Sequence, residues 1–394
     1  MEVKPGYKQT EVGVIPEDWE VKCLGELGNV VRGGSPRPAG DARYFNGNFI
    51  PWLTVGSLTN IPTDQLFVTD TATKLTEKGS QLSRTLQDGT LVIVNSGART
   101  LGVSKVLAIT CCANDGIAAL VSQSAGEKRF LCFFLNSQIR RLREVVAAGN
   151  DQLNLNTGRI ALIAVPFPKE TEQRAIAMAL SDVDALLGGL DSLIAKKKGL
   201  KVAAMQQLLT GQTRLPGFSG EWEVKRLGEV VQIRKGQLIT STTLLPGDIP
   251  VIAGGKQPAY FHASANRFGR TITISASGAS AGYVALYDAP IFASDCSTIS
   301  ESEFYCLDFV FYHLLCKQQV IYKAQTGGAQ PHIHAKDLNP ILFAFPELQE
   351  QTAIAAILSD MDTELAALQA RRTKTQALKQ AMMQELLTGR TRLI

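Results

Sequence analysis

The chain has 394 residues, more than one compact domain usually contains, so two globular units with connecting elements are expected. Hydrophobic residues make up 45% of it and charged residues 19%, a composition that excludes wholesale disorder. The formal net charge of +4 is too small to indicate nucleic-acid binding by itself, so any DNA-binding face must come from local clusters of basic residues.

The cysteines and the hydropathy of the chain indicate in which compartment the protein is found. The 7 cysteines are odd in number and include no Cys-x-x-Cys pair, which favours reduced thiols over disulfides or a metal site. No uncharged apolar run approaches ~18 residues, and no apolar signal-peptide core lies near the start. We therefore expect a cytoplasmic protein that neither enters nor crosses a membrane.

The first part of the chain, residues 1–165, is predicted to form a mixed α+β module. A Gly/Pro-rich basic loop, Arg32–Pro38, is able to approach a phosphate backbone. The run Leu91–Val94 is typical of a strand and is followed by turn residues 95–97. Residues 130–146 then have the character of a helix, which completes a mixed module.

A long helix is predicted after Pro168, because proline does not fit inside a helix and Glu172 supplies a first-turn acid. Apolar residues recur at alternating steps of four and three, a heptad seam that packs against a partner helix. This first seam consists of Ile176, Leu180, Val183, Leu187, Leu190 and Ile194. The helix is expected to end at Gly211 in a left-handed cap, after about 40 residues or roughly 60 Å.

A second module and a second long helix are predicted beyond the connection 211–222, which contains Pro216 and three glycines. Residues 271–274 are typical of a strand, and residues 309–325 of a helix. The second long helix is expected to end at Gly389. Its seam consists of Ile354, Leu358, Met361, Leu365 and Leu368.

The two halves of the chain repeat at their ends and differ in the middle. The block around Trp19 returns around Trp222, 203 residues later, whereas the block that begins at Phe167 returns at Phe345, only 178 residues later. The material between the blocks is therefore about 25 residues longer in the first half. This pattern suits two similar modules that each recognise a different target. The alternative is a duplicated domain whose loops have diverged without a change of role.

Two helices of equal length can pair within one chain, and their length argues against core helices of separate domains. Apolar residues outside the seam are interpreted as an exposed docking surface for another subunit. They are Leu208, Leu209, Leu386 and Leu387.

Ten residues are candidate DNA contacts. Basic residues exceed acidic ones by four in residues 20–150 and by one in residues 223–326. An arginine that binds a guanine edge through two hydrogen bonds contributes ~1–3 kcal/mol of discrimination between bases. The alternative for each candidate is that it is ordinary solvated surface. The candidates are Arg32, Arg37, Arg43, Arg99, Arg234, Lys235, Lys256, Gln257, Arg267 and Arg270.

Motifs for catalysis are absent from the sequence. Asn339-Pro340-Ile341-Leu342 fails the Asn/Asp-Pro-Pro-aromatic pattern of adenine methyltransferases, and Gly254-Gly255-Lys256 lacks the spacing of a nucleotide-binding phosphate loop. His332-Ile333-His334 has no further metal ligands nearby, and the corresponding position of the first half is Asn154-Leu155-Asn156, which favours a structural turn. We expect no catalytic residues and no metal.

The repeated blocks carry a family resemblance. PEDWEVKCLGEL and GFSGEWEVKRLGEV, the FP-x₃-EQ openings of the helices, and the endings LLTGQTRL and LLTGRTRL resemble the specificity subunits of type I restriction-modification systems. Segments inside the modules, including RGGSPRP and GDIPVIAGGKQPAYF, also look like target-recognition domains of that family.

The resemblance implies an α+β fold with a pseudo-twofold internal repeat, in which two target-recognition domains are separated by a pair of long antiparallel coiled-coil helices. The first target-recognition domain would span residues 1–165 and the central long helix residues 166–212. The second target-recognition domain would span residues 213–342 and the C-terminal long helix residues 343–394.

The resemblance also implies the function and the partners. Each domain would read one half of a bipartite, asymmetric site in double-stranded DNA, and the helices would dock two modification (methyltransferase) subunits. Restriction subunits would join them, so S-adenosylmethionine, ATP and Mg would bind to partner subunits and no cofactor to this non-catalytic chain. The paired helices would act as a ruler that sets the gap between half-sites, since modules in successive grooves need a separation near ~34–36 Å.

Two other classes of function remain open at this point. One is a self-contained DNA methyltransferase or nuclease with unrecognised motifs. The other is a coiled-coil adaptor that binds only protein.

Overall fold

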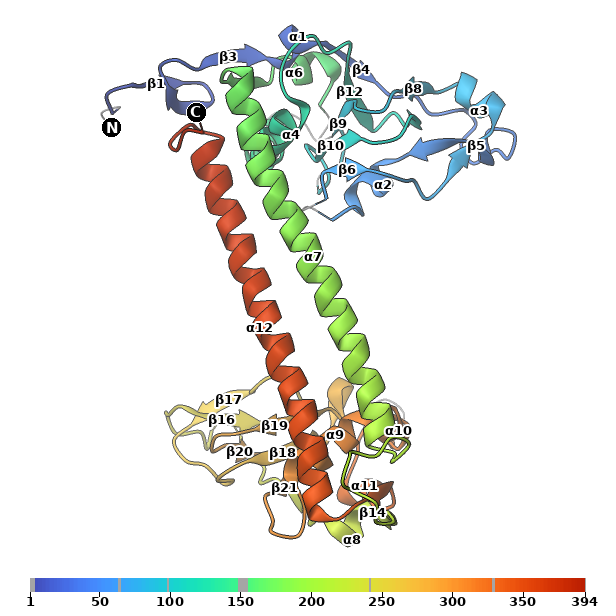
Figure 1. The fold of residues 1–394 in the computed structure, drawn as a ribbon, viewed down its shortest axis with the longest axis vertical. Helices are drawn as coiled ribbons and strands as arrows, with labels where there is room; N and C mark the ends of the chain where they lie inside the picture. Colours follow the sequence, from blue (N-terminus) through green and yellow to red (C-terminus); the bar gives the residue numbers. More distant parts are fainter. Residues whose placement is uncertain are drawn as a thin grey trace. The chain divides into compact units, whose positions relative to one another are not determined.

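The computed structural model describes residues 4–62, 65–97, 99–147, 155–240, 242–327 and 330–393. They pack into two compact units, of which unit 1 comprises Met1–Ser192 with Ala370–Ile394 and unit 2 comprises Leu193–Gln369. Both boundaries fall inside the two long helices, α7 (Glu170–Leu208) and α12 (Leu348–Leu386), so each unit contains one end of each helix (Figure 1). Each long helix has 39 residues, which agrees with the length predicted from the seams.

Unit 1 contains two principal sheets. The first has the order β4-β12-β9-β10-β6, and the second the order β7-β5-β11-β8. The strands of the first are β4 (Asn29–Arg32), β12 (Ile117–Val121), β9 (Leu91–Val94), β10 (Ser104–Leu107) and β6 (Phe67–Val68). Those of the second are β7 (Lys74–Leu75), β5 (Phe45–Leu53), β11 (Cys111–Ala113) and β8 (Arg84–Leu86).

Smaller elements complete unit 1. A hairpin of β1 (Tyr7–Thr10) and β2 (Gly13–Pro16) precedes β3 (Glu20–Cys23), and β3 pairs antiparallel with β13 (Ala164–Phe167), the strand that leads into α7. The short helices are α1 (Leu24–Leu27), α2 (Val55–Thr59), α3 (Glu77–Gln81), α4 (Lys128–Ser137), α5 (Ile139–Ala147) and α6 (Thr157–Ala161). The helix predicted over 130–146 is thus two helices that meet at Gln138.

Unit 2 repeats this plan with fewer strands. Its sheets have the orders β15-β21-β18-β19 and β17-β16-β20, and β14 pairs with β22. The strands are β14 (Glu223–Arg226), β15 (Arg234–Lys235), β16 (Ile249–Ile252), β17 (Tyr260–His262), β18 (Thr271–Ser275), β19 (Val284–Tyr287), β20 (Phe292–Ala293), β21 (Cys296–Ser300) and β22 (Leu342–Phe345). The short helices are α8 (Leu227–Val230), η1 (Gly278–Ser280), α9 (Leu307–Cys316), α10 (Gln318–Lys323) and α11 (Ala335–Leu338).

The pairing of strands shows where the repeat is kept and where it is extended. Strand β5 pairs parallel with β11 as β16 does with β20, and β9 forms an antiparallel hairpin with β10 as β18 does with β19. The first strand of each hairpin, β9 and β18, is the strand predicted from the sequence. Unit 1 adds β6 and β8 to the shared plan, within the part of the chain that is longer in the first half.

The two long helices run antiparallel within each unit. In unit 1, Asp191 pairs with Arg372 and Asp184 pairs with Lys379, so residue numbers rise along one helix as they fall along the other. Unit 2 shows the same order, because Lys197 pairs with Glu364 and Lys201 with Asp362. The predicted antiparallel pair of helices is therefore present.

The predicted seam residues lie mostly inside. Eight are buried: Ile176, Leu180, Leu187, Leu190, Ile194, Ile354, Leu358 and Leu365. Val183, Met361 and Leu368 are half-buried. This burial is what a helix-pairing seam requires, and the contacts of individual seam residues across the helices stay a prediction.

The prediction of an exposed docking surface at the helix ends is wrong. Leu208 and Leu209 are 7% and 0% exposed and belong to the core of unit 2, together with Phe309 of α9. Leu386 and Leu387 are 5% and 2% exposed and belong to the core of unit 1. The reason is that each unit packs the end of one long helix against the start of the other. The spacing of apolar residues in the sequence does not reveal this packing.

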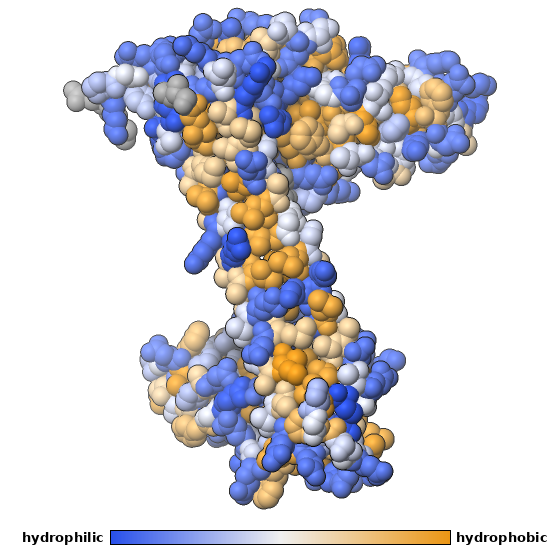
Figure 2. Space-filling model, in the orientation of Figure 1, coloured by the Kyte–Doolittle hydropathy of each residue, from blue (hydrophilic) through white to orange (hydrophobic). Residues whose placement is uncertain are grey.

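Other apolar side chains of the long helices are exposed instead. Figure 2 shows hydrophobic residues interspersed with hydrophilic ones along these helices. In unit 1 the exposed residues are Met178, Leu186 and Leu378, and in unit 2 they are Leu193, Leu200, Val202, Leu348 and Ile357.

Candidate DNA-recognition site

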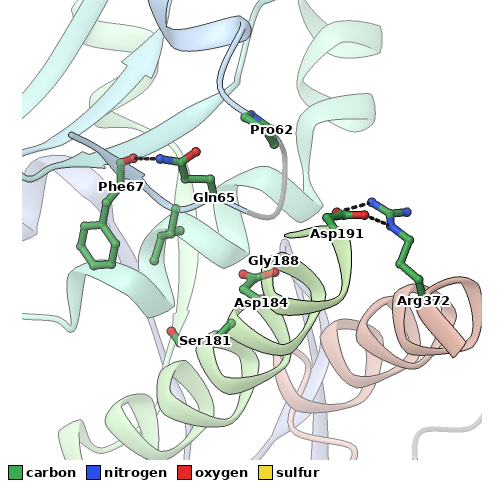
Figure 3. A pocket seen from close by; sticks show the side chains of 10 residues that line it. Pro62, Gln65, Phe67, Ser181, Asp184, Gly188, Asp191 and Arg372 are labelled. Carbon is green, nitrogen blue, oxygen red and sulfur yellow. Dashed lines mark hydrogen bonds and ion pairs between the residues drawn. The ribbon is translucent and has the colours of Figure 1, made fainter. Parts of the chain in front are cut away.

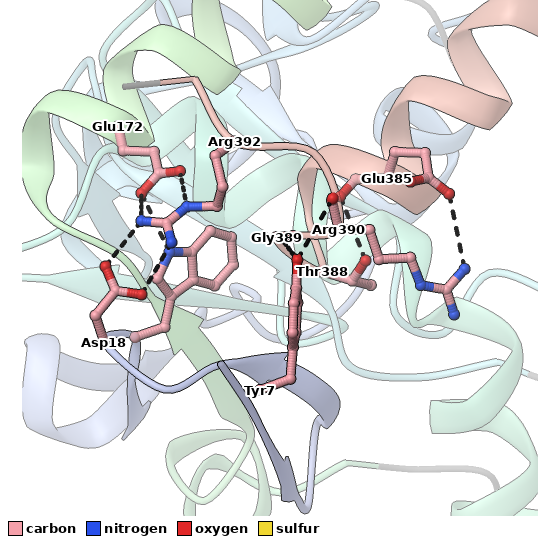
Figure 4. Close-up of polar contacts among 9 residues, drawn as sticks. Tyr7, Asp18, Glu172, Glu385, Thr388, Gly389, Arg390 and Arg392 are labelled. Atoms are coloured by element: carbon pink, nitrogen blue, oxygen red, sulfur yellow. Dashed lines mark hydrogen bonds and ion pairs between the residues drawn. The ribbon is translucent and has the colours of Figure 1, made fainter. Parts of the chain in front are cut away.

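A repeated polar contact fixes the start of each long helix to its module. The carboxylate of Glu172 accepts hydrogen bonds from Trp19 Nε1 (3.1 Å) and from Arg392 Nε (2.6 Å), and Arg392 also binds Asp18 (Figure 4). The hydrogen bonds from Arg392 lower the pKa of the Asp18 carboxyl. Tyr7 from the β1–β2 hairpin donates a hydrogen bond to the carbonyl of Gly389 nearby.

The same contact occurs in unit 2. Glu350 accepts hydrogen bonds from Trp222 Nε1 (3.1 Å) and from Arg214 Nε and Nη2 (both 2.7 Å). The glutamines that follow the two glutamates are equivalent as well, because Gln173 donates to the carbonyl of Pro168 and Gln351 to that of Pro346. The glutamate, glutamine and proline of the FP-x₃-EQ blocks thus anchor the helices, so these blocks are structural.

The predicted left-handed caps are confirmed at both helix ends. Gly211 has φ +71° and Gly389 has φ +68°. A side chain at Gly389 would also lie 2.5 Å from Pro16, so glycine is needed there for both conformation and space.

Two of the candidate DNA contacts of unit 1 meet at one carboxylate. Arg32 ends β4 and Arg37 lies in the loop that follows, and both guanidinium groups approach Asp115, at 3.9 and 3.7 Å. Ser35 Oγ donates a 2.7 Å hydrogen bond to the same carboxylate, and Arg32 Nε donates a 2.6 Å hydrogen bond to the Asp115 carbonyl. The Ser35 hydroxyl, followed by the charges of Arg32 and Arg37, lowers the pKa of Asp115.

The loop can make these contacts because its backbone lies against another loop. A Cβ atom at Gly33 would lie 2.1 Å from the carbonyl oxygen of Asn114, so only glycine fits. Gly33 N donates to the carbonyl of Ile117 and Gly34 N to that of Ala113. Gly33 of the basic loop therefore serves close packing, which holds Arg32 and Arg37 beside Asp115.

A third arginine joins this group and was missed by the sequence analysis. Arg84, at the start of β8, donates a 2.8 Å hydrogen bond from Nε to the carbonyl of Arg32, and its neighbour Ser83 donates to the carbonyl of Gly34. We call Arg32, Arg37, Arg84 and Asp115 the arginine cluster. Arg84 stands in a polar strand with no Gly/Pro loop around it, so its basic side chain was the only available signal.

The other two candidates of unit 1 have different partners. Arg43 is held by Asp41 through hydrogen bonds of 3.0 Å from Nε and 2.6 Å from Nη2, and this contact lowers the pKa of Asp41. Arg99 is exposed in the loop between β9 and β10, where its carbonyl accepts a hydrogen bond from Arg143.

Two candidates of unit 2 hold the unit together. Arg267 donates to Thr298 Oγ1 and to the carbonyl of Lys235, both at 2.9 Å, and is half-buried. Arg270 binds both carboxylate oxygens of Asp308 at 2.6 and 2.7 Å and also pairs with Asp288, which raises its pKa. Both arginines therefore have structural partners, which weakens the prediction that they contact DNA.

The remaining candidates of unit 2 are exposed: Arg234, Lys235, Lys256 and Gln257. Lys256 Nζ lies 5.6 Å from the centre of the Tyr283 ring. Gly254, in the same loop, lies against Ser277, whose hydroxyl donates to the carboxylate of Asp295. Asp295 follows β20 as Asp115 follows β11, so it occupies the position in unit 2 that Asp115 occupies in unit 1.

A groove of about 630 Å³ lies elsewhere in unit 1, between the β6 segment and α7 (Figure 3). Gln65 and Phe67 line it from one side and Ser181 and Gly188 from the other, with the Asp191–Arg372 pair at one end. Within the described chain, none of the ten candidate DNA contacts lines this groove.

The described residues contain neither a cluster of metal-ligating side chains nor a membrane-spanning helix. In that part of the chain, no group of three or more His, Cys, Asp or Glu side chains could hold a metal ion. His332 and His334 stack on each other with ring centres 6.2 Å apart. Of their predicted counterparts, Asn154 lies outside the described residues, and Asn156 is the N-cap of α6 as His334 is of α11. None of the described helices is long and apolar enough to span a membrane.

The fold defines a class of protein in which an α+β module and a long helix occur twice in tandem. A family model described as the type I restriction modification DNA specificity domain matches residues 16–194 and again residues 219–379. The chain therefore belongs to the type I restriction-modification DNA specificity family. The match to a binding family favours this assignment over a self-contained methyltransferase or nuclease.

Curated relatives and a solved structure agree with this family assignment. The MjaVIII specificity subunit of Methanocaldococcus jannaschii is 23% identical over 96% of this chain and 94% of its own length. The MjaIX specificity subunit of the same organism is 22% identical, but the match spans about half of its length, 55%, and 58% of this chain. A crystal structure of a type I restriction-modification S subunit from M. genitalium has the same fold, with a TM-score of 0.65, 17% identity and 98% of each chain covered.

Proposed function

We propose that each module reads one half of a bipartite, asymmetric site in double-stranded DNA. The observation that carries this proposal is that the two modules share a strand plan but differ at equivalent positions. In unit 1 the carboxylate of Asp115 lies among arginines, whereas in unit 2 Asp295 lies beside Ser277 and the loop of Lys256. Side chains of different chemistry at equivalent positions suit half-sites of different sequence.

The chain acts in this proposal as a non-catalytic subunit in the cytoplasm. Two modification subunits supply S-adenosylmethionine and the methylating site, and restriction subunits supply ATP- and Mg-dependent translocation and cleavage. This division of labour is supported by the sequence, which lacks methyltransferase and phosphate-loop motifs.

The long helices provide the docking surface for the modification subunits in this proposal. Exposed apolar residues such as Met178, Leu186 and Leu200 are unusual on helices that already bury a seam, and such surfaces mark sites of protein association. These residues replace the helix-end leucines, which are buried.

Genome-wide mapping of methylated adenines, with and without this chain, tests the proposal. A bipartite motif that disappears when the chain is deleted is the expected result. Purified chain that methylates or cuts DNA without partners would instead support a self-contained enzyme. Salt-sensitive, sequence-selective DNA binding by the complex with a modification subunit would argue against a coiled-coil adaptor that binds only protein.

A further inference from the structure

The arginine cluster gathers an excess of positive charge on an exposed part of unit 1. The side chains of Arg32 and Arg37 are 59% and 73% exposed although both approach Asp115, and Arg84 is also exposed. Two guanidinium groups share one carboxylate, and Arg84 donates to the carbonyl of Arg32, so two positive charges are uncompensated within the cluster. Exposed guanidinium groups of this kind match the phosphate oxygens and guanine edges of DNA.

The carboxylate of Asp115 is itself fixed. Ser35 Oγ donates to it at 2.7 Å, Arg32 Nε donates to its backbone carbonyl at 2.6 Å, and Asn95 Nδ2 lies 3.4 Å from the same carbonyl. Because Gly33 packs against the backbone of Asn114, the loop that carries Arg37 has little room to shift. A hydrogen bond thus holds Arg32, and an ion pair of 3.7 Å holds Arg37, before any ligand arrives, and holding of this kind lowers the entropic cost of binding.

Unit 2 copies the cluster only in part: Lys235 precedes Gly236 as Arg32 precedes Gly33, and Arg267 donates to the carbonyl of Lys235 as Arg84 does to that of Arg32. Residue Asp295 takes the place of Asp115, but Gly236 is followed there by Gln237 and Leu238, without arginine or proline. The neighbouring loop of unit 2 contributes Lys256 instead. Among the described residues, a pair of arginines on this carboxylate is therefore found in unit 1 and not in unit 2, and it would act on one half-site only.

We propose that Asp115 is a positioning residue that presents Arg32 and Arg37 as a fixed pair to the DNA of one half-site, with Arg84 beside them. This inference rests on the proposed function and names the residues that read one half of the site. A carboxylate facing DNA would ordinarily weaken binding by repulsion, so its value here lies in orienting the two arginines.

The variant Asp115→Asn separates these two effects. It removes a negative charge but keeps the size of the side chain, so simple electrostatics predicts tighter binding to every duplex. Loss of orientation predicts that selectivity for the mapped site over a scrambled duplex falls about fivefold or more, since a well-placed arginine contributes ~1–3 kcal/mol of discrimination. Fluorescence anisotropy of the complex with its modification subunits, at several salt concentrations, measures both quantities.

Arg37→Gln and Arg140→Gln complete the test. Arg37→Gln should lower selectivity and reduce the slope of log affinity against log salt by about 1 for a lost phosphate contact. Adding Asp115→Asn to it should cause a smaller loss than Asp115→Asn causes alone, because only the orientation of Arg32 is then left to lose. Arg140 is 92% exposed on α5 of the same unit, so Arg140→Gln is a charge-matched control that should bind like the wild type.

Methylation mapping of the variants locates the effect. Relaxed sequence preference confined to one half of the bipartite motif supports the inference. Tighter binding of Asp115→Asn to both duplexes with unchanged selectivity, or relaxation spread over both halves, overturns it. If Asp115→Asn does not fold, unchanged selectivity of Arg37→Gln overturns it equally. A wild-type complex without any bipartite preference would refute the proposed function instead, and the two failures are thereby distinguishable.

Discussion

Arg214 binds the carboxylate of Glu350 through two parallel hydrogen bonds, both 2.7 Å long. Glu350 lies in the first turn of α12, whereas Arg214 follows the end of α7, so this pair joins the end of one long helix to the start of the other within unit 2. Arg392 and Glu172 form the same contact in unit 1 with the helices exchanged. The internal repeat is therefore a repeat of interhelical contacts as well as of modules.

Arg214→Ala should destabilise unit 2 by about 3 kcal/mol, because it leaves the carboxylate of Glu350, only 3% exposed, without its cation. Chemical denaturation followed by tryptophan fluorescence measures this loss, since Trp222 donates to the same carboxylate. Arg390→Ala is the matched control, because Arg390 is 63% exposed and comes no closer than 3.7 Å to Glu385. This variant should change the free energy of unfolding by less than about 0.5 kcal/mol. Equal effects of the two variants would contradict the structural role of Arg214.

His313 should make unit 2 less stable in acid. Burial, followed by the charge of Lys317, lowers the pKa of its imidazole to about 4, below the ordinary 6.5. At neutral pH the ring is uncharged in both folded and unfolded states. As the pH falls through 6.5 the unfolded chain binds a proton that the folded chain excludes, so about 2 kcal/mol of stability is lost by pH 5.

The variant His313→Phe should remove this loss. Phe134 occupies the corresponding position of α4 in unit 1, and His313 stacks on Phe343 with ring centres 4.6 Å apart, so an aromatic ring fits. Urea denaturation at pH 7.5 and pH 5 compares the two proteins. A wild-type difference that persists in His313→Phe would assign the acid sensitivity to other groups.

The helices and their ends were predictable from sequence because their signals are local. A heptad seam, a proline before the first turn and a glycine after the last determine the bounds of α7 and α12 to within a few residues. The duplicated blocks likewise predicted the repeat. The error at Leu208, Leu209, Leu386 and Leu387 arose because their burial depends on contacts with residues far away in sequence, such as Phe309 in unit 2.

The candidate site was less predictable for a related reason. The sequence marks Arg32 and Arg37 through their Gly/Pro-rich loop, but it does not show that Asp115 receives both, since 80 residues separate Ser35 from that carboxylate. The sequence also cannot distinguish Arg270, which binds two carboxylates inside unit 2, from an arginine that is available to a ligand. Only the packing of distant strands separates these roles.

The exposed apolar residues of α7 should be required for assembly. Leu186→Glu, at a residue 43% exposed, should leave folding intact but reduce co-purification with the modification subunit, because a charge would be buried in the interface. Leu162→Glu is the control, since Leu162 is 73% exposed but follows α6 in the module and belongs to neither long helix. Size-exclusion chromatography of the mixed subunits measures both, and equal recovery of complex with the two variants would exclude this docking surface.

The length of the paired helices should set the gap between the two half-sites. Insertion of four residues in the α7 seam after Leu186, matched by four in α12 after Gln376, lengthens each helix by about 6 Å. The two positions are at similar levels, because Asp184 pairs with Lys379 and Asp191 with Arg372. Since successive turns of DNA are ~34–36 Å apart for 10–10.5 base pairs, the preferred gap should grow by about one or two base pairs. Methylation mapping reads the gap directly.

Four residues inserted after Ser219, in the connection between α7 and β14, serve as the control and should leave the gap unchanged. A gap that stays constant in the helix variant while methylation persists would mean that the spacing is set by the partner subunits or by the DNA, not by the helices of this chain.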